Sequence, residues 1–180
     1  MRAIRFIRKA VSLNIDDVTL LSIEEAARVP EKLRAIGRWW WLRSPGMAVA
    51  RACYVGGDGS TSPVGYYVGN SPYENEEGSC IGVRPALVIG NLKALNFVMG
   101  EEIELAGHRW TIISGNMALC NDVIGEHEFR KYLRTEHDSF TTKDGSSYPL
   151  VQLNKYEYSD VKAFLDDWAF KNGLLVRQAA

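Results

Sequence analysis

The sequence predicts an α+β fold, in which an irregular antiparallel sheet carries flanking helices. Two observations predict it. Short segments rich in β-branched and aromatic residues alternate with turn residues, which is typical of hairpins, and an apolar stripe with helical spacing lies near the C-terminus. The most distinctive segment is 38–46, Arg-Trp-Trp-Trp-Leu-Arg-Ser-Pro-Gly, which holds three of the five tryptophans. We expect this segment to be the central strand.

The three tryptophans should divide between the two faces of that strand. Successive side chains of a pleated strand point to opposite faces, so we expect Trp39 and Trp41 on one face and Trp40 on the other. Trp40 is then the residue whose exposure decides whether a free face can bind a ligand. Proline removes a ladder donor and glycine permits a reversal, which should end the strand. The terminating residues are Ser44, Pro45 and Gly46.

The segment before the tryptophans predicts two short strands and two short helices. The polar stretch Asn14–Asp17 predicts a turn before the second strand. Ser22 and Glu25 have the spacing of a capping box, which starts a helix. Pro30 suits a first helical turn. The predicted elements are strands at 4–7 and 18–21 and helices at 23–28 and 30–36.

A hairpin and a longer strand follow the tryptophans. Gly-Gly-Asp-Gly, with Asp58 in third place, is a dense turn signal. A polar, acidic segment then predicts an exposed loop, and Pro85 marks an edge or a bulge inside the strand that follows the loop. The predicted elements are strands at 48–55, 64–68 and 81–89 and a loop at 70–79.

The second half predicts another hairpin, a short strand and two helices. Ala106 and Gly107 form the hairpin turn. The last helix has the strongest pattern, because Ser159 suits its cap, Gly173 its end, and apolar residues recur at helical spacing between them. The other predicted elements are strands at 102–105, 108–113 and 117–120, a helix at 126–134 and a loop at 138–147.

Composition is that of an ordinary globular protein. The 180 residues are 46% hydrophobic, which suits one domain or two interlocked halves. The 21 basic and 22 acidic side chains nearly cancel, so we expect neither nucleic acid nor an anionic membrane as the main partner. No apolar run approaches the roughly 20 residues that span a bilayer, and the first residues do not read as a signal peptide, which predicts a cytosolic protein.

The residues that carry chemistry do not form a catalytic pattern. Cys53, Cys80 and Cys120 are odd in number and widely spaced, which predicts reduced thiols rather than disulfides or a zinc site. We therefore predict no catalytic residue, no metal and no cofactor. Arg43 and Arg84 lie in apolar strands, where an arginine must be paired or bonded to carbonyl oxygens. We expect them to tie strands together, and an anion site between them is the alternative.

Several motifs resemble the DUF6273 family, a domain of phages, prophages and gut bacteria. They are Trp-Trp-Leu-Arg-Ser-Pro-Gly at 40–46, the turn at 58–59 and Gly-Val-Arg-Pro-Ala-Leu at 82–87. The segments 107–113, 117–120 and 156–168 resemble the family's tryptophan strand, apolar strand and helix, so that the resemblance covers most of residues 17–170. The resemblance implies structural roles for Trp39, Trp41, Arg43, Ser44, Pro45, Asp58, Gly82, Arg84, Pro85, Trp110 and Trp168.

The order of these segments departs from the family's order. The segments that resemble 108–113 and 159–168 precede the Trp-Leu-Arg-Ser block in the family, whereas here they follow it. Either the domain is circularly permuted or the C-terminal half is separate. We favour one permuted domain over 1–180, built from halves at about 1–96 and 97–180, because neither half alone has enough elements to close a core.

The family in turn resembles the C-type-lectin-like fold, which formylglycine-generating enzymes also use. Those enzymes carry a cysteine pair, and Cys53 and Cys80 are the nearest candidates here. Neither lies in a stretch that matches the enzymes' catalytic motif, so we expect no oxidase activity. The calcium-binding triplets of true C-type lectins are not present in the sequence. Metal-independent sugar stacking on an exposed tryptophan is the carbohydrate-binding alternative.

These considerations predict a non-catalytic protein-binding module. Long polar loops should carry the binding, and tyrosine favours interfaces because it offers a large area and a hydroxyl at small entropic cost. The candidate binding residues are Trp40, Tyr66, Tyr67, Tyr73, Glu74, Glu76, Glu77 and Tyr148.

The family's occurrence implies a phage or prophage protein that acts in the host cytosol as a monomer or homodimer. Its partner would be another protein, host or phage, for example a host defence nuclease inhibited in the manner of an anti-CRISPR protein. A structural virion or tail component is the other alternative.

Overall fold

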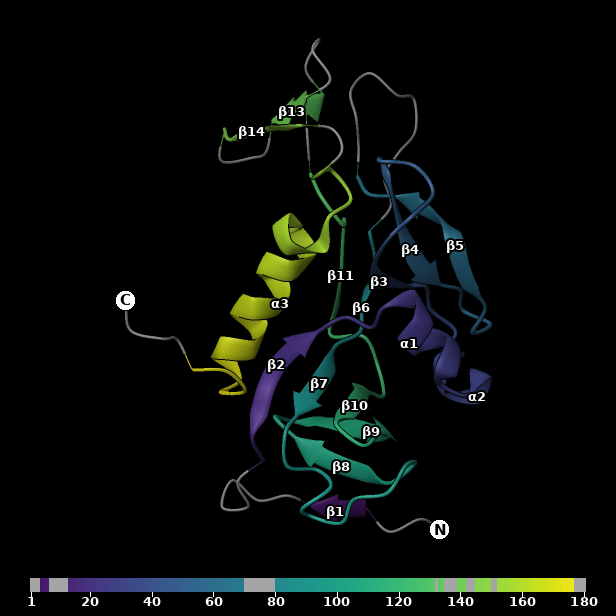
Figure 1. Cartoon of the computed structure of the whole chain (residues 1–180), viewed down its shortest axis with the longest axis vertical. Coiled ribbons are helices and arrows are strands. Elements are labelled where there is room, and N and C mark those ends of the chain that lie inside the picture. Colours follow the sequence, from purple (N-terminus) through teal and green to yellow (C-terminus); the bar gives the residue numbers. More distant parts are fainter. Residues whose placement is uncertain are drawn as a thin grey trace.

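The structure is a computed structural model that describes residues 4–6, 13–69, 80–131, 133–134, 139–141, 145–149 and 152–176. Two large sheets and a small third one are accompanied by helices (Figure 1). The predicted α+β class is confirmed. Within the described ranges, no helix combines the length and the apolar character that crossing a membrane requires.

The first sheet has six strands in the order β1-β8-β9-β10-β7-β2. Its neighbours pair antiparallel except for β1 and β8, which are parallel. The strands are β1 (Ile4–Phe6), β2 (Ile15–Thr19), β7 (Ala86–Ile89), β8 (Glu102–Leu105), β9 (His108–Ser114) and β10 (Met117–Cys120).

The second sheet has five strands in the order β11-β6-β3-β4-β5, so the tryptophan strand β3 is its middle strand. β3 pairs parallel to β6 and antiparallel to β4. The strands are β3 (Trp40–Pro45), β4 (Arg51–Val55), β5 (Thr61–Tyr67), β6 (Ile81–Val83) and β11 (Gly125–His127). A small sheet contains β12 (Leu133–Arg134), β13 (Ser139–Thr141) and β14 (Ser147–Pro149).

The helices begin where the sequence predicts. Ser22 caps α1 (Ile23–Arg28) in a complete capping box with Glu25, and Ser159 caps α3 (Asp160–Lys171). α2 (Glu31–Arg34) is shorter than predicted, and the 3-10 turn η2 (Tyr156–Tyr158) precedes α3. α1 contacts β3 and β5, whereas α3 contacts β2 and lies on the other side of the molecule (Figure 1).

Two apolar clusters form the core, and β3 contributes to both. Trp41 belongs to the larger cluster and Trp40 to the smaller one, which confirms that they point to opposite faces. The larger cluster joins residues from both ends of the chain, for example Val18, Trp110 and Leu165. The assignment of the two halves to one permuted domain stays a prediction.

The single strand predicted at 81–89 is wrong, because the chain changes sheets inside it. β6 ends at Val83 and belongs to the second sheet, whereas β7 begins at Ala86 and belongs to the first. Arg84 and Pro85 form the break. Proline has no N–H for a strand ladder, and here its carbonyl accepts a hydrogen bond from the N–H of Cys120.

Other element predictions also need correction. The helix predicted at 126–134 is wrong, because residues 125–127 pair with β6 as β11 and residues 133–134 form β12. The turn predicted at Asn14–Asp17 is wrong too, since β2 already begins at Ile15. The loop predicted at 138–147 contains β13 and the first residue of β14. The loop predicted at 70–79 lies outside the described residues.

Candidate functional site

Aromatic side chains gather on the second sheet, where β3, β4 and β5 lie side by side. Trp39, directly before β3, is 45% exposed. Its ring stacks on Tyr54 of β4, with 4.9 Å between ring centroids, and meets the edge of Tyr66 of β5 at 5.6 Å. Tyr66 contacts Tyr67 in turn at 6.1 Å. We call Trp39, Tyr54, Tyr66 and Tyr67 the aromatic surface.

Strand pairing holds this surface in place. Ala52 of β4 lies opposite Tyr66, and Arg51 lies opposite Tyr67. The Arg51 guanidinium lies 4.4 Å from the centroid of the Tyr67 ring, and its Nη2 donates to the Tyr67 hydroxyl at 2.8 Å. Tyr54 and Tyr66 are half-buried and pack against the larger core cluster. The core cluster therefore supports the aromatic surface on its inner side, and the Trp39 ring is the outermost part of the surface.

The prediction that Trp40 is a binding residue is wrong. Its side chain is fully buried in the smaller core cluster. Its indole N–H donates to the backbone oxygen of Arg34 at 3.3 Å. Trp39 instead is the exposed member of the three. Alternation along the strand predicted the opposite faces, but both faces of β3 are covered, so the exposed ring lies just before the strand begins.

The other predicted binding residues do not form one group. Tyr66 and Tyr67 belong to the aromatic surface, whereas Tyr148 stacks on Tyr158 with 6.1 Å between ring centroids and lies 5.4 Å from the Arg130 guanidinium. The remaining candidates, Tyr73, Glu74, Glu76 and Glu77, lie outside the described residues.

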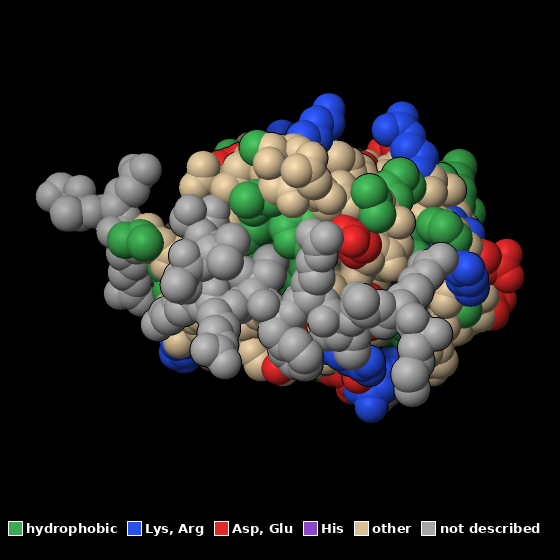
Figure 2. Space-filling model, turned by 90° about the horizontal axis from the view of Figure 1, so that it is seen from below, with side chains coloured by type: hydrophobic (Ala, Val, Ile, Leu, Met, Phe, Trp, Pro, Cys, Tyr) green, Lys and Arg blue, Asp and Glu red, His purple; other side chains and the backbone are tan. Residues whose placement is uncertain are grey.

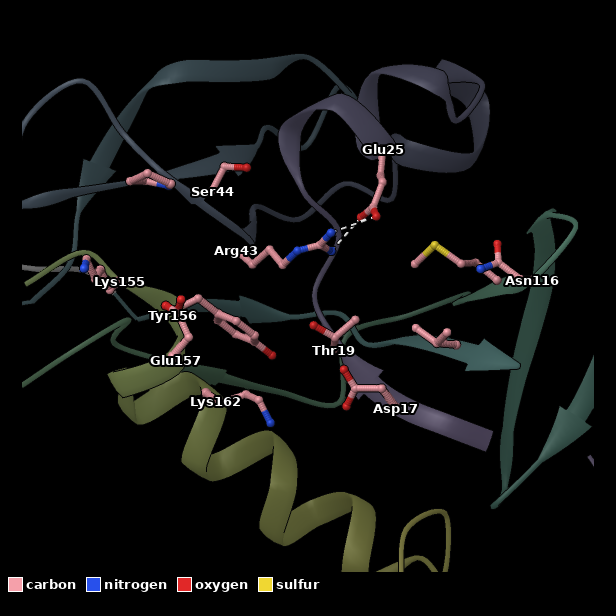
Figure 3. A pocket seen from close by; sticks show the side chains of 13 residues that line it. Asp17, Thr19, Glu25, Arg43, Ser44, Asn116, Lys155, Tyr156, Glu157 and Lys162 are labelled. Carbon is pink, nitrogen blue, oxygen red and sulfur yellow. Dashed lines mark hydrogen bonds and ion pairs between the residues drawn. The ribbon is translucent and has the colours of Figure 1, made fainter. Parts of the chain in front are cut away.

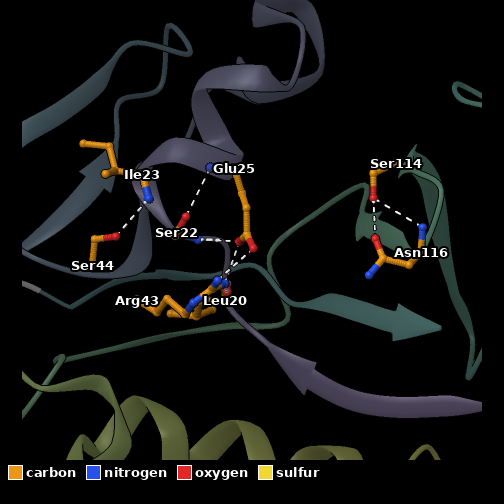
Figure 4. Close-up of polar contacts among 8 residues, drawn as sticks. All are labelled: Leu20, Ser22, Ile23, Glu25, Arg43, Ser44, Ser114 and Asn116. Carbon is orange, nitrogen blue, oxygen red and sulfur yellow. Dashed lines mark hydrogen bonds and ion pairs between the residues drawn. The ribbon is translucent and has the colours of Figure 1, made fainter. Parts of the chain in front are cut away.

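Arg43 is held by the start of the first helix, as Figure 4 shows. Its Nη1 donates to the backbone oxygen of Leu20 at 2.6 Å, and its guanidinium pairs with both carboxylate oxygens of Glu25. Ser44, next to it, accepts the N–H of Ile23 at 3.0 Å. These bonds join β3 to the start of α1 and to the residue after β2, and the prediction that Arg43 ties strands together stays a prediction.

Arg84 is buried in the break between β6 and β7. Its Nε donates to the backbone oxygen of Cys120 at 2.7 Å, and its guanidinium lies 4.9 Å from the centroid of the Trp40 ring. Burial lowers the pKa of Arg84 to about 10, so it is still a cation at neutral pH. Arg84 and Arg43 share none of these partners, and Glu25 already neutralises Arg43. The anion site between the two arginines stays an alternative prediction.

Three of the remaining motif residues make local contacts. Asp58 accepts the N–H and the hydroxyl of Ser60 and so closes the β4–β5 turn. Trp110 donates its indole N–H to the Leu105 oxygen at 3.0 Å, and Trp168 lies 6.4 Å from the Trp110 ring. Pro45, the last residue of β3, is exposed.

Gly82 lies where two strands pass closely. A Cβ at this position would lie 2.4 Å from Val123 Cγ1 and 2.8 Å from the Trp39 oxygen. Its N–H donates to that same oxygen at 2.8 Å, which joins β6 to the tryptophan segment. Only glycine fits this approach without displacing a neighbour.

A cavity of about 860 Å³ lies beside Arg43, between β3, the first sheet and α3 (Figure 3). Apolar side chains contribute one part of its lining and polar side chains the rest. The lining residues are Asp17, Thr19, Glu25, Arg43, Ser44, Pro45, Val88, Asn116, Met117, Lys155, Tyr156, Glu157 and Lys162. The sequence offered no signal for this cavity, because its walls come from segments far apart in the chain.

Tyr156 and Thr19 are buried polar side chains in the wall of this cavity. Tyr156 is 7% exposed, and burial raises the pKa of its hydroxyl far above the usual range. Thr19 and the backbone of Leu20 lie near the hydroxyl and oppose that rise. Within the described ranges the hydroxyl makes no hydrogen bond of good geometry.

The cysteines do not form a reactive pair. Cys53, Cys80 and Cys120 are all free thiols. Cys53 is buried in β4, where its Sγ lies 3.1 Å from the oxygen of Pro45, and burial raises its pKa. Cys80 is exposed before β6. Within the described ranges, no three His, Cys, Asp or Glu side chains are grouped so that they could hold a metal ion.

Figure 2 shows the end of the molecule that lies lowest in Figure 1, around β8 and β9. On its coloured part, hydrophobic side chains lie in separate groups among polar ones, and basic side chains lie near the margin. The exposed residues Val98 and Met99 belong to the segment between β7 and β8. They are far in sequence from the aromatic surface.

Comparison with known proteins identifies one family. The family described as a domain of unknown function (DUF6273) matches residues 16–91. The matched segment contains both central motifs, at 40–46 and 82–87, but it ends before the second half of the chain. No curated protein and no solved structure matches the chain.

Proposed function

Residues 16–91 form a DUF6273 domain, and on that premise we propose that the protein is a non-catalytic binding module for another protein. The observation that carries the proposal is the exposed Trp39 ring, which is stacked on Tyr54 and braced by Tyr66. Tryptophan and tyrosine are enriched among the residues that dominate binding energy in protein interfaces. A ring that is already fixed loses little conformational entropy when a partner binds.

The aromatic surface has further exposed apolar residues in its strands and the turn beside them. Val64 of β5 is exposed, as are Met47 and Val49 between β3 and β4. The N–H of Met47 bonds to the oxygen of Val64, which holds that turn against β5. An exposed apolar area of this kind, next to rigid aromatic rings, favours a protein partner.

The partner in this proposal is a host or phage protein that the module meets in the cytosol of a phage-infected or prophage-carrying cell. A host defence nuclease is one member of that class, and the protein would inhibit it as anti-CRISPR proteins inhibit their nucleases. The support for this partner is analogy with the family's occurrence in phages and prophages. We also propose that the domain has a C-type-lectin-like fold and that the protein is a monomer or a homodimer.

Affinity capture with matched variants tests the proposal. The wild-type protein and the variants Trp39→Ala, Tyr66→Ala and Met99→Ala are each used to capture proteins from lysate of the bacterium that carries the gene. We expect a protein that wild type and Met99→Ala retain and that Trp39→Ala and Tyr66→Ala lose. Met99 is 66% exposed, against 45% for Trp39, and lies elsewhere, so it controls for a general loss of exposed apolar surface.

Three other outcomes would contradict the proposal. Retention of the same proteins by all four forms would remove the aromatic surface as the binding site. Binding of the Trp39 ring to immobilised polysaccharide, lost in Trp39→Ala, would favour the metal-independent carbohydrate binder instead. A large ordered assembly in light scattering would favour the virion component.

A further inference from the structure

The aromatic surface carries hydrogen-bond donors that have no acceptor within the described ranges. The indole N–H groups of Trp40 and Trp41 bond to backbone oxygens, whereas the indole N–H of Trp39 makes no such bond there. The hydroxyl of Tyr54, the ring on which Trp39 stacks, is also unbonded in that part of the chain and is not closed off from solvent. A ligand on this surface therefore meets groups that can donate to it.

Two arginines lie beside the surface. Arg38, directly before Trp39, is exposed and forms no ion pair in the part of the chain that the structure describes. Arg51 bonds to the Tyr67 hydroxyl and to the Gly65 oxygen, so the partners that it has here are neutral. The three strands β3, β4 and β5 contain no acidic residue. The surface is therefore positively charged.

Asp58, in the turn between β4 and β5, does not change this picture. Its carboxylate accepts the N–H and the hydroxyl of Ser60 at 2.9 and 2.7 Å, and these bonds lower its pKa without a contribution from Arg38. Opposite charges across an interface favour the correct partner and disfavour others. A partner that brings carboxylates therefore suits the surface.

The edge of the second sheet is unsuited to an added strand. β5 is the end strand of that sheet (Figure 1), and it contains Pro63, which has no N–H to donate. Gly65, two residues later, has a φ of 84°, which breaks the regular course of the strand. A partner segment therefore has to bind through the side chains of the surface rather than by strand pairing.

An extended segment that contains proline has the matching chemistry. Proline has no N–H but keeps its carbonyl oxygen, so such a segment offers acceptors and few donors. A helix, in contrast, uses most of its carbonyl oxygens internally. Proline-rich segments are already extended before they bind, and their rigid rings lose little entropy when they pack on fixed aromatic rings.

We propose that the aromatic surface binds an extended, proline-containing segment of the partner protein, with acidic side chains beside the prolines. The proline rings pack on Trp39 and Tyr66, the carbonyl oxygens of the segment accept from the Tyr54 hydroxyl, and an acidic side chain pairs with Arg38. This inference rests on the proposed function, because it specifies the chemistry of the partner at the same surface.

NMR of the tryptophan indole groups provides a direct test. The ¹⁵N-labelled protein is titrated with three synthetic peptides of equal length: prolines between flanking aspartates, prolines between flanking lysines, and alanines between flanking aspartates. The Trp39 signal is assigned with Trp39→Phe, and the signal of Trp110, which is buried and bonded to the Leu105 oxygen, is the internal reference. We expect saturable movement of the Trp39 signal, with about 5-fold tighter binding of the acidic proline peptide than of the other two.

Two pairs of variants connect the signal to the proposed contacts. Tyr54→Phe removes only the hydroxyl, so we expect about 3- to 10-fold weaker binding of the acidic proline peptide, whereas Tyr158→Phe, at an exposed tyrosine elsewhere, should leave it unchanged. Arg38→Gln should weaken binding about 2- to 5-fold and reduce its salt dependence. Arg109→Gln, at an exposed arginine of β9 in the other sheet, should do neither.

Three results would overturn the inference. They are a Trp39 signal that none of the peptides moves, equal affinity for the proline and alanine peptides with aspartates, and tighter binding of the peptide with lysines. A single-stranded thymidine oligonucleotide that binds more tightly than the acidic proline peptide would indicate nucleic acid as the ligand instead. Because Arg38 is exposed, Arg38→Gln keeps the test decisive if Tyr54→Phe does not fold.

Failure of this inference is distinguishable from failure of the proposed function. A captured protein that Trp39→Ala loses, together with a Trp39 signal that no peptide moves, would support protein binding by the aromatic surface and refute the proline-containing segment. If all forms capture the same proteins and no peptide moves the signal, both proposals fail.

Discussion

Glu25 and Arg43 meet through two hydrogen bonds, from Nη1 to Oε2 at 2.6 Å and from Nη2 to Oε1 at 2.8 Å. The same Oε2 accepts the backbone N–H of Ser22 at 2.8 Å and so completes the capping box of α1. Arg43 in turn holds the Leu20 oxygen. One carboxylate therefore joins the end of β2, the start of α1 and the central strand β3.

Glu25→Ala should lower the free energy of unfolding by about 1–2 kcal/mol, because it removes a helix cap together with a partly screened ion pair. Both side chains keep roughly a third of their exposure, which limits the ion pair's share. Urea denaturation measures the change. Glu31→Ala, at an exposed acidic residue in the first turn of α2, is the control and should cost much less. Equal losses would contradict a special role for Glu25.

The same ion pair predicts a pH dependence. Burial, the largest influence, raises the pKa of Glu25, but the hydrogen bonds from Arg43 and Ser22 outweigh it and lower the pKa below its ordinary value of 4.5. A carboxylate whose pKa is lowered by folding stabilises the protein above that value, and this stabilisation is lost as the pH falls through the lowered pKa. The stability advantage of wild type over Glu25→Gln should therefore be full at neutral pH and shrink below pH 4.5. An advantage that grows toward acid pH would refute the assignment.

Replacements of Arg84 should rank in an unusual order. Arg84→Met loses the bond to the Cys120 oxygen but also removes a buried charge, whereas Arg84→Lys keeps the charge in a compact, strongly hydrated ammonium. We expect Arg84→Lys to be less stable than Arg84→Met by about 1–2 kcal/mol, since burying an ammonium without a partner is costly. Thermal unfolding of both variants measures the order. The reverse order would indicate an acidic partner for residue 84.

Quenching of tryptophan fluorescence should report Trp39. Trp39 is 45% exposed, whereas Trp40, Trp41 and Trp110 are fully buried and Trp168 is half-buried. Acrylamide should therefore quench Trp39→Phe much less than wild type. Trp40→Phe should keep the wild-type quenching and lose stability instead, because it removes part of a packed ring and the indole bond to Arg34. Equal quenching of wild type and Trp39→Phe would contradict the exposed position.

Gly82→Ala should destabilise the protein by about 1–3 kcal/mol, the usual cost of overpacking. A Cβ there meets both Val123 Cγ1 and the Trp39 oxygen. Adding Val123→Ala should therefore recover only part of the lost stability, because this second substitution leaves the Trp39 oxygen in contact with the new Cβ. Gly107→Ala is the matched control, since it places a Cβ in open space and carries only the strain of its positive φ. Full recovery in the double variant would refute the backbone contact.

Local signals predicted most elements well, and the misses have a common cause. Ser22, Ser159 and the Asp58 turn act within a few residues, so their sequence pattern suffices. Segment 81–89 is apolar throughout, and that pattern does not reveal that its two halves pair in different sheets. Segment 126–134 has helical spacing, but pairing of its start with β6 outweighs the weak helical preference.

The functional-site predictions also divide into those that the sequence supports and those that need the tertiary structure. The sequence by itself determined the α+β class, the DUF6273 motifs, the role of β3 as a central strand and the tyrosines at 66 and 67 as candidates. Only the tertiary structure decided that Trp39, and not Trp40, is exposed, and that Tyr156, Arg43 and Asp17 line one cavity. The physical reason is that alternation specifies which way a side chain points, whereas exposure depends on what the rest of the chain packs against that face.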